Sequence, residues 1–114
     1  MKNYTLFFRM DVLSDPPDKE TMKNYLNDWY KWLDKMADEG HLAEGGNHFS
    51  KEGTVLKSDG NSQAGPYVAD GISIAGYLNI IAKDLEHAKS IASECPILKG
   101  KGNSVEIRAW GNVE

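Results

Sequence analysis

The opening residues alternate between two faces in the way that a β-strand does. Residues 4–10, YTLFFRM, place one set of side chains on one face and a second set on the other: Tyr4, Leu6, Phe8 and Met10 against Thr5, Phe7 and Arg9. Both faces carry apolar groups, which predicts a strand covered on both sides. The same period of two predicts a long strand at 73–82, SIAGYLNIIA, and a last strand at 104–110, SVEIRAW.

A helical period follows the first strand. Apolar residues recur at intervals of three and four, as on one face of an α-helix: Met22, Tyr25, Leu26, Trp29, Leu33 and Met36, with Trp32 widening the face. The segment 14–17, Ser-Asp-Pro-Pro, breaks the chain before this helix, so Ser14 or Asp15 can cap its start. Acidic residues at 18 and 20 favour its positive end, and Gly40 fits a left-handed stop.

The middle of the chain has only short periodic runs. HLAEGGNHF and TVLKS, separated by a turn at 51–53, predict two brief strands joined as a hairpin, and 59–66, DGNSQAGP, has the composition of a loop. Asp84 can cap a second helix, which Pro96 ends. The inward face of this helix is expected to hold Leu85, Ala88, Ile91, Ala92 and Cys95.

This order of elements predicts an α+β fold. Strand, long helix, two short strands, long strand, helix and strand form the ferredoxin-like β-α-β-β-α-β arrangement with an inserted hairpin. In that arrangement an antiparallel sheet carries two helices on one face. A chain of 114 residues has the size of one domain, so a single domain is expected over 1–114.

The sheet face that the helices leave open is not wholly polar. If Ile74 and Leu78 of the long strand point inward, Tyr77 points the other way, and Phe7 and Trp110 share its face. Exposed aromatic residues gathered on one face are typical of an interface. We therefore expect a homodimer in which two sheets meet face to face about a two-fold axis.

Charge and cysteine content narrow the choice of partners. Thirteen basic and 17 acidic residues give a formal net charge of -4, which is unlike the basic surfaces that bind nucleic acids or anionic membranes. Cys95 is the only cysteine, which excludes an internal disulfide and fits a reducing compartment. No apolar run is long enough for a membrane-spanning helix, so a cytoplasmic protein is expected.

Several fragments, taken in order along the chain, are similar to those of a known protein family. The opening YTLFFR, the tryptophan-bearing helix, HLAEGG, the GPY turn, IAGYLNIIA, the helix ending in ECP and the final SVEIRAW together resemble the YCII-related family, in particular its DGPF branch. The resemblance covers about residues 3–110. It implies a ferredoxin-like fold assembled as a dimeric α+β barrel, with a cleft near the GPY turn, and it implies no known reaction.

The sequence departs from this branch at its charged positions. The usual Asp-Gly-Pro-Phe appears as Ala-Gly-Pro-Tyr, so Ala64 stands where the leading carboxylate is expected. Ala69, Gly71 and Ile72 occupy the acidic and basic positions that commonly follow, which leaves Asp70 one place away from the expected carboxylate.

Four residues are candidates for a ligand site: Arg9, His48, Tyr67 and Asp70. His48, in GGNHF, carries an imidazole suited to acid–base catalysis, and Asp70 could orient it, although a single loop histidine is also typical of a structural residue. Arg9 interrupts an apolar strand and requires either an anionic ligand or an internal carboxylate, for which Glu106 and Asp70 are available. Tyr67 can present its phenol to a ligand or pack as an aromatic group.

Other chemistry finds little support in the sequence. His41, His48 and His87 lack the spacing of metal ligands, so neither a metal nor another cofactor is expected. Cys95 lies on the inner stripe of a helix and is interpreted as a core residue. The leading hypothesis is a homodimer that binds a small organic ligand in a cleft. The alternatives are a cofactor-free isomerase, lyase or monooxygenase that uses His48, and an accessory or regulatory interaction module.

Overall fold

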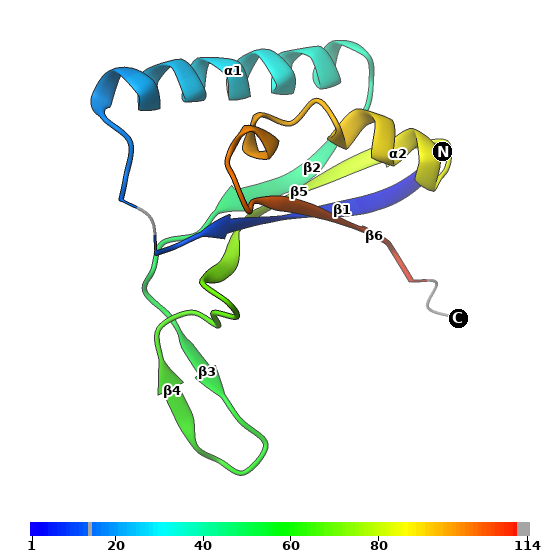
Figure 1. Cartoon of the computed structure of the whole chain (residues 1–114). Helices are drawn as coiled ribbons and strands as arrows, with labels where there is room; N and C mark the ends of the chain where they lie inside the picture. Colours follow the sequence, from blue (N-terminus) through cyan, green and yellow to red (C-terminus); the bar gives the residue numbers. More distant parts are fainter. Residues whose placement is uncertain (14, 112–114) are drawn as a thin grey trace.

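The fold is α+β, with helices on one side of an antiparallel sheet (Figure 1). A computed structural model describes residues 1–13 and 15–111. Four strands form the main sheet in the order β2 (Leu42–His48), β5 (Ile72–Ala82), β1 (Lys2–Asp11) and β6 (Ser104–Ala109), and β3 (Thr54–Leu56) pairs with β4 (Ser62–Ala64) in a separate hairpin. The helices are α1 (Lys19–Asp38), α2 (Leu85–Ala92) and the short 3-10 helix η1 (Pro96–Lys99). The strand order is consistent with a ferredoxin-like arrangement.

The core forms between the helices and the inner face of the sheet. Tyr4, Leu6 and Phe8 of β1 alternate onto this face and are buried, as the period of two predicts. Ile80 of β5 and Ile97 of η1 pack in the same cluster. The alternation predicted for the first strand is therefore confirmed.

Helix α1 begins later than the Ser-Asp-Pro-Pro break. Asp18 is its N-cap, because its carboxylate accepts a hydrogen bond from the backbone N–H of Thr21 over 2.7 Å. Capping from Asp15 is thus wrong, and Ser14 lies outside the described residues. The cap hydrogen bonds lower the pKa of Asp18, as expected for a carboxylate that is stabilised in its ionised form. Gly40 follows the helix with φ of 77°, the left-handed stop that the sequence predicts.

The buried face of α1 is narrower than its apolar stripe. Trp32 and Met36 are buried, and Trp29 and Leu33 pack partly against the core. Met22 and Leu26, which the period places on the same face, are exposed to solvent. The helical period is confirmed, but its first half stays exposed because the core lies under the second half of the helix.

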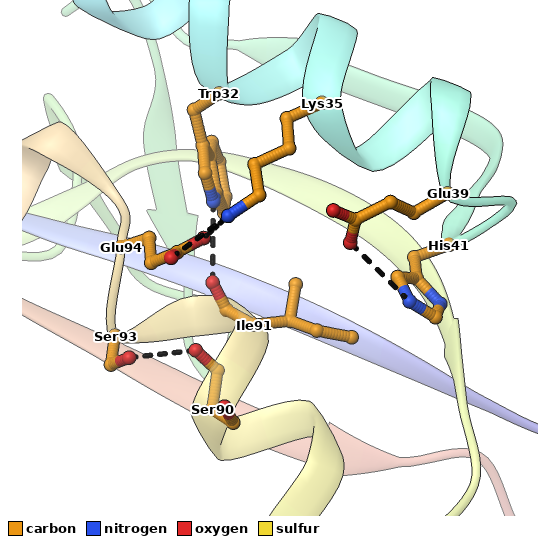
Figure 2. A network of polar contacts seen from close by, with 8 residues as sticks. All are labelled: Trp32, Lys35, Glu39, His41, Ser90, Ile91, Ser93 and Glu94. Carbon is orange, nitrogen blue, oxygen red and sulfur yellow. Dashed lines mark hydrogen bonds and ion pairs between the residues drawn. The ribbon is translucent and has the colours of Figure 1, made fainter.

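Helix α2 is joined to α1 by contacts between side chains and backbone. Trp32 Nε1 donates a hydrogen bond of 3.2 Å to the backbone carbonyl of Ile91, and Lys35 forms an ion pair of 3.0 Å with Glu94 (Figure 2). Asp84 caps α2 as predicted, by accepting from the backbone N–H of His87. Leu85, expected to face inward, is 54% exposed because the first turn of the helix extends beyond the core.

Strand β2 joins the main sheet and does not form the predicted hairpin. It pairs with β5, with an irregular register between Leu42 and Gly46. The hairpin consists instead of β3 and β4, and it projects away from the sheet (Figure 1). Residues 62–64, assigned to a loop from their composition, are therefore a strand. Pairing with the long strand β5 offers β2 more backbone hydrogen bonds than pairing with the three-residue β3 does.

Strand β5 contains a bulge that changes which face its first residues take. The register against β1 shifts between Phe8, which faces Gly76, and Arg9, which faces Ile74. The extra residue reverses the alternation, so that Ile74 lies on the face opposite to Leu78. The prediction that Ile74 points inward is consequently wrong.

The face of the sheet away from the helices is called here the outer face. Phe7 lies directly opposite Tyr77 on it, and Phe49, which follows β2, stacks on Tyr77 with ring centroids 5.8 Å apart. Trp110 and Ile74 lie on the same face and are exposed. The prediction that aromatic residues gather on this face is confirmed.

Candidate functional site

The strand arrangement brings the four candidate residues to one end of the sheet. β1 and β2 both run antiparallel to β5, so their last residues lie beside the first residues of β5. Arg9 is near the end of β1, His48 is the last residue of β2, and Tyr67 and Asp70 precede β5. We call this end, where the Gly65-Pro66-Tyr67 turn lies, the GPY end.

The GPY turn is held to its surroundings through the backbone. Gly65 has φ of 89°, and its N–H donates a hydrogen bond of 2.7 Å to the carbonyl of Gly53. The carbonyl of Tyr67 accepts a hydrogen bond of 2.6 Å from the hydroxyl of buried Ser73. The Tyr67 ring itself is 72% exposed, so its position is set by the backbone rather than by packing of the ring.

Asp70 lies at the tip of a tight turn. Ala69 and Ile72 exchange two backbone hydrogen bonds of 2.9 Å, and the two residues between them have positive φ, 53° for Asp70 and 77° for Gly71. This is the geometry for which Asp-Gly is favoured in two-residue hairpins. The Asp-Gly pair is therefore explained by the turn, and the carboxylate of Asp70 faces solvent.

Arg9 lies on the outer face in an ion pair with β6. Its Nη1 is 2.7 Å from Glu106 Oε1, while Arg108 Nη1 is 3.4 Å from the other carboxylate oxygen. The sequence analysis gave Glu106 and Asp70 as possible internal partners of Arg9. In the structure Arg9 pairs with Glu106. The Arg9 and Glu106 side chains are each about one-third exposed, at 35% and 37%, so this pair contributes little stability, on the order of 0–1 kcal/mol.

His48 is exposed at the edge of the sheet. It lies opposite Gly76 of β5, and within residues 1–13 and 15–111 its imidazole makes no hydrogen bond or ion pair. A hydrogen bond between His48 and Asp70, which would orient the imidazole for catalysis, is likewise absent among these residues. The structure thus brings the two residues to the same end of the sheet without joining them.

A pocket lies beside the GPY turn. It is a partly open pocket of about 330 Å³, lined by residues of the hairpin and the turn: Val55, Gln63, Ala64, Gly65, Pro66, Tyr67 and Val68. Of the four candidate residues, only Tyr67 lines it. We call this cavity the GPY pocket.

A chain of hydrogen bonds crosses the outer face, which the sequence reasoning did not anticipate. Trp110 Nε1 donates to Thr5 Oγ1 over 2.9 Å, Thr5 donates to Asn79 Oδ1 over 2.7 Å, and Asn79 Nδ2 donates to the carbonyl of Glu44 over 3.1 Å. Gly45 makes room for the last contact, because a Cβ at this position would lie 2.6 Å from Asn79 Nδ2. The chain connects all four strands of the main sheet.

Two histidines that were weighed only as metal ligands pack against each other. The rings of His41 and His87 meet edge to face with centroids 4.8 Å apart. Nε2 of His41 lies 3.8 Å from Glu39 Oε2 (Figure 2), whereas Nδ1 of His87 accepts a hydrogen bond from the backbone N–H of Lys83. These contacts link the end of α1 to the start of α2. The residues that the structure describes include no group of three or more His, Cys, Asp or Glu side chains arranged to hold a metal ion.

Cys95 is a buried core residue, as predicted, but α2 ends at Ala92, so Cys95 lies between α2 and η1 and not on the helical stripe. Burial raises the pKa of its thiol from 9.0 to about 12, because the thiolate would lose its hydration. The nucleophilic form is therefore scarce in the folded protein at neutral pH.

We expect Cys95 to be almost unreactive toward Ellman's reagent at pH 8 while the protein is folded. A pKa raised from 9.0 to about 12 lowers the thiolate fraction roughly a thousandfold relative to the unfolded chain, and burial also blocks access. The measurement compares the reaction rate in buffer with the rate in denaturing urea. Because folding raises this pKa, the thiol's contribution to the free energy of unfolding is present below about pH 9 and is lost as the pH rises toward 12. Equal rates in buffer and urea would contradict this account.

Comparison with known proteins adds no family assignment. No protein-family model matches the sequence, and no curated protein matches it significantly. The resemblance to the YCII-related family therefore depends on the sequence fragments alone. Among the described residues, no helix is both long and apolar enough to cross a membrane.

Proposed function

We propose that this protein is YCII-related and binds a compact organic ligand in the GPY pocket. The observation that carries the proposal is the pocket itself, at the turn where the family resemblance implies a cleft. Ligand pockets commonly have volumes of about 300 to 1,000 Å³. At about 330 Å³, this one suits a small molecule and is too small for a dinucleotide or a peptide.

The lining of the pocket favours an uncharged ligand of mixed polarity. Val55, Pro66 and Val68 supply apolar surface, and Gln63 and Tyr67 supply an amide and a phenol. No charged side chain lines the cavity, so an anionic ligand would be desolvated there without a counter-charge.

The acid–base alternative receives no support from this lining. His48 and Asp70 do not line the GPY pocket, and Tyr67 is its only titratable side chain. Arg9 is engaged with Glu106 on the outer face, which favours a structural role over an anion-binding one. Binding without an identified reaction is therefore the function that we propose.

We further propose that the protein is a homodimer in which two outer faces meet, as in a dimeric α+β barrel. The aromatic residues Phe7, Phe49 and Tyr77 supply apolar area on a face that the helices do not cover. A two-fold axis would place this face against itself, which is the commonest form of assembly. A protein that remains a single chain in native mass spectrometry contradicts the homodimer.

Filling the GPY pocket tests the proposed binding site. The variant Ala64→Trp places a large ring at a position that lines the cavity, and Ala69→Trp is the matched control, because Ala69 is also exposed but does not line it. Native mass spectrometry of protein titrated with a library of small neutral organic molecules is expected to show adducts on the wild-type protein and on Ala69→Trp. Ala64→Trp is expected to lose them.

Two results would contradict the proposal. One is a wild-type protein to which no member of the library binds. The other is equal binding to Ala64→Trp and the wild-type protein, which would place the ligand elsewhere. Circular dichroism of both variants verifies that they fold.

A further inference from the structure

The chain contains two Asp-Gly pairs, and the structure holds them differently. Asp59-Gly60 lies in the loop at the tip of the hairpin of β3 and β4, and Asp70-Gly71 forms the turn that leads into β5. Both aspartates are exposed. When glycine follows aspartate, the backbone nitrogen of the glycine can approach the side-chain carboxyl closely, because glycine has no Cβ in the way. Attack by this nitrogen closes a five-membered succinimide ring.

Hydrogen bonds hold both reacting groups of Asp59-Gly60. The N–H of Gly60 donates to the carbonyl of Lys57 over 3.0 Å. The carboxylate of Asp59 accepts from the backbone N–H of Asn61 over 2.9 Å and from its side-chain amide over 3.2 Å. These bonds must break before the nitrogen can turn toward the carboxyl, so the native loop opposes ring closure.

Neither reacting group of Asp70-Gly71 is held in this way. Within the part of the chain that the structure describes, the carboxylate of Asp70 and the N–H of Gly71 form no hydrogen bond or ion pair. Two hydrogen bonds between Ala69 and Ile72 close the turn, and the carbonyl of Gly71 accepts a third from Val12. Among the described residues Asp70 is the one non-glycine residue with positive φ, a conformation that side chains disfavour. Opening the turn therefore breaks few bonds and relieves this conformation.

We propose that Asp70 is a site of spontaneous covalent modification, where the backbone is converted through a succinimide to an isoaspartyl linkage. First, the nitrogen of Gly71 forms a bond to Cγ of the Asp70 carboxyl, and the hydroxyl of that carboxyl leaves with the amide proton as water. Water then adds to the main-chain carbonyl of Asp70, and its original bond to the nitrogen breaks. The nitrogen remains joined to Cγ, and the α-carboxylate becomes free. One water leaves and one returns, so no oxidant, reductant or other reactant is required.

The modification changes the turn on which it occurs. An isoaspartyl linkage runs through Cβ and Cγ and lengthens the main chain by one atom, which does not fit a two-residue turn. We therefore expect the hydrogen bonds between Ala69 and Ile72 to be lost. Ser73, whose hydroxyl donates to the carbonyl of Tyr67, follows directly, so the anchor of the GPY turn is weakened as well. The reaction lies beside the GPY pocket but does not depend on ligand binding there.

Incubation of the wild-type protein tests this inference. Folded protein is kept for several weeks in mildly acidic buffer, and a parallel sample is kept in guanidinium chloride. Circular dichroism verifies that the first sample stays folded. Chymotrypsin cleaves after Tyr67, which separates the two Asp-Gly pairs onto different peptides. Electron-transfer fragmentation then distinguishes isoaspartate from aspartate in each peptide.

In the folded sample we expect isoaspartate to form at Asp70 roughly tenfold faster than at Asp59, because hydrogen bonds hold only the second pair. In guanidinium chloride the two rates should be similar, since no native hydrogen bond remains. Equal rates in the folded sample, or faster modification of Asp59, overturn the proposal. An unmodified Asp70 in folded protein whose denatured counterpart is modified overturns it too.

Asp70→Asn and Asp59→Asn form a matched pair for a second test. Asparagine closes the same ring by releasing ammonia in place of water, and Asn-Gly suits a two-residue turn as well as Asp-Gly does. Ammonia release from the folded variants is expected to be roughly tenfold faster for Asp70→Asn, for the same reason. Release from Asp59→Asn at an equal or higher rate contradicts the assignment of Asp70 as the reactive site.

Discussion

Replacing Trp32 with alanine is expected to lower the free energy of unfolding by about 3–5 kcal/mol, the usual cost of removing a buried tryptophan. The side chain is buried, its ring meets Trp29 at 5.4 Å and Phe8 at 6.4 Å, and its Nε1 donates to the Ile91 carbonyl. Alanine would remove the ring contacts and leave that carbonyl without its donor. Urea denaturation followed by circular dichroism measures the change.

Two further variants separate the contributions of Trp32. Trp32→Phe retains most of the ring packing and loses the hydrogen bond to Ile91. Its decrease in the free energy of unfolding should therefore lie between zero and the decrease in the alanine variant. Lys31→Ala, at an exposed neighbouring position, should change stability by less than about 0.5 kcal/mol. If Trp32→Ala costs no more than Lys31→Ala, Trp32 does not anchor α1 to α2.

Gly76→Ala is expected to disrupt the pairing of β2 with β5. A Cβ at residue 76 would lie 2.6 Å from the carbonyl oxygen of Asn47 and 3.0 Å from the Cα of His48, and both atoms belong to backbone that cannot move independently of the strand. Overpacking of this kind costs about 1–3 kcal/mol, and the upper end is expected here. We therefore predict faster amide hydrogen exchange throughout β2, with a lower midpoint of urea denaturation.

The control for Gly76→Ala is Gly53→Ala. Gly53 precedes β3, and the nearest atom to an added Cβ is 4.0 Å away, so alanine fits there without strain. This variant should be neutral or slightly stabilising, because alanine restricts the unfolded chain more than glycine does. Unchanged exchange in β2 of Gly76→Ala would contradict the close approach of the two strands.

Features that depend on neighbouring residues were the most predictable from the sequence. Asp84 caps α2, and β1 alternates, because a cap and a strand face are set within a few residues. Met22 and Leu26 continue the helical period, yet period alone cannot tell how far the core extends beneath a helix. Only the position of α1 over the sheet, which the structure shows, explains why the first half of the helix is exposed.

Features that depend on distant pairing were not predictable. β2 could pair with β3 or with β5, and only the tertiary arrangement chooses β5. The bulge in β5 reverses the alternation directly before Gly76, and a glycine inside a strand is a signal for such a bulge that the sequence reasoning did not use. The error at Ile74 follows from this single shift.

The candidate site was predicted in part. The sequence allowed Glu106 or Asp70 as the partner of Arg9, and the structure has Glu106. The expectation of a cleft near the GPY turn came from the family resemblance, and a pocket lies beside that turn. Whether His48 and Asp70 meet depends on the paths of two loops, which residue types do not determine. The alternation of the two strands places Thr5 and Trp110 on the same face, but their contact depends on the register of β1 and β6, which only the structure shows.

The irregular pairing of β2 has a consequence for the behaviour of the protein at high concentration. β2 and β6 are the edge strands of the sheet, where unpaired backbone groups can recruit strands from other molecules. Two glycines with positive φ, Gly45 and Gly46, interrupt the β2 edge, and β6 is only six residues long and carries Glu106 and Arg108. A bulged edge and a short, charged edge are both poor templates for strand addition. The sheet is thereby protected at each side against the edge-to-edge growth that leads to amyloid.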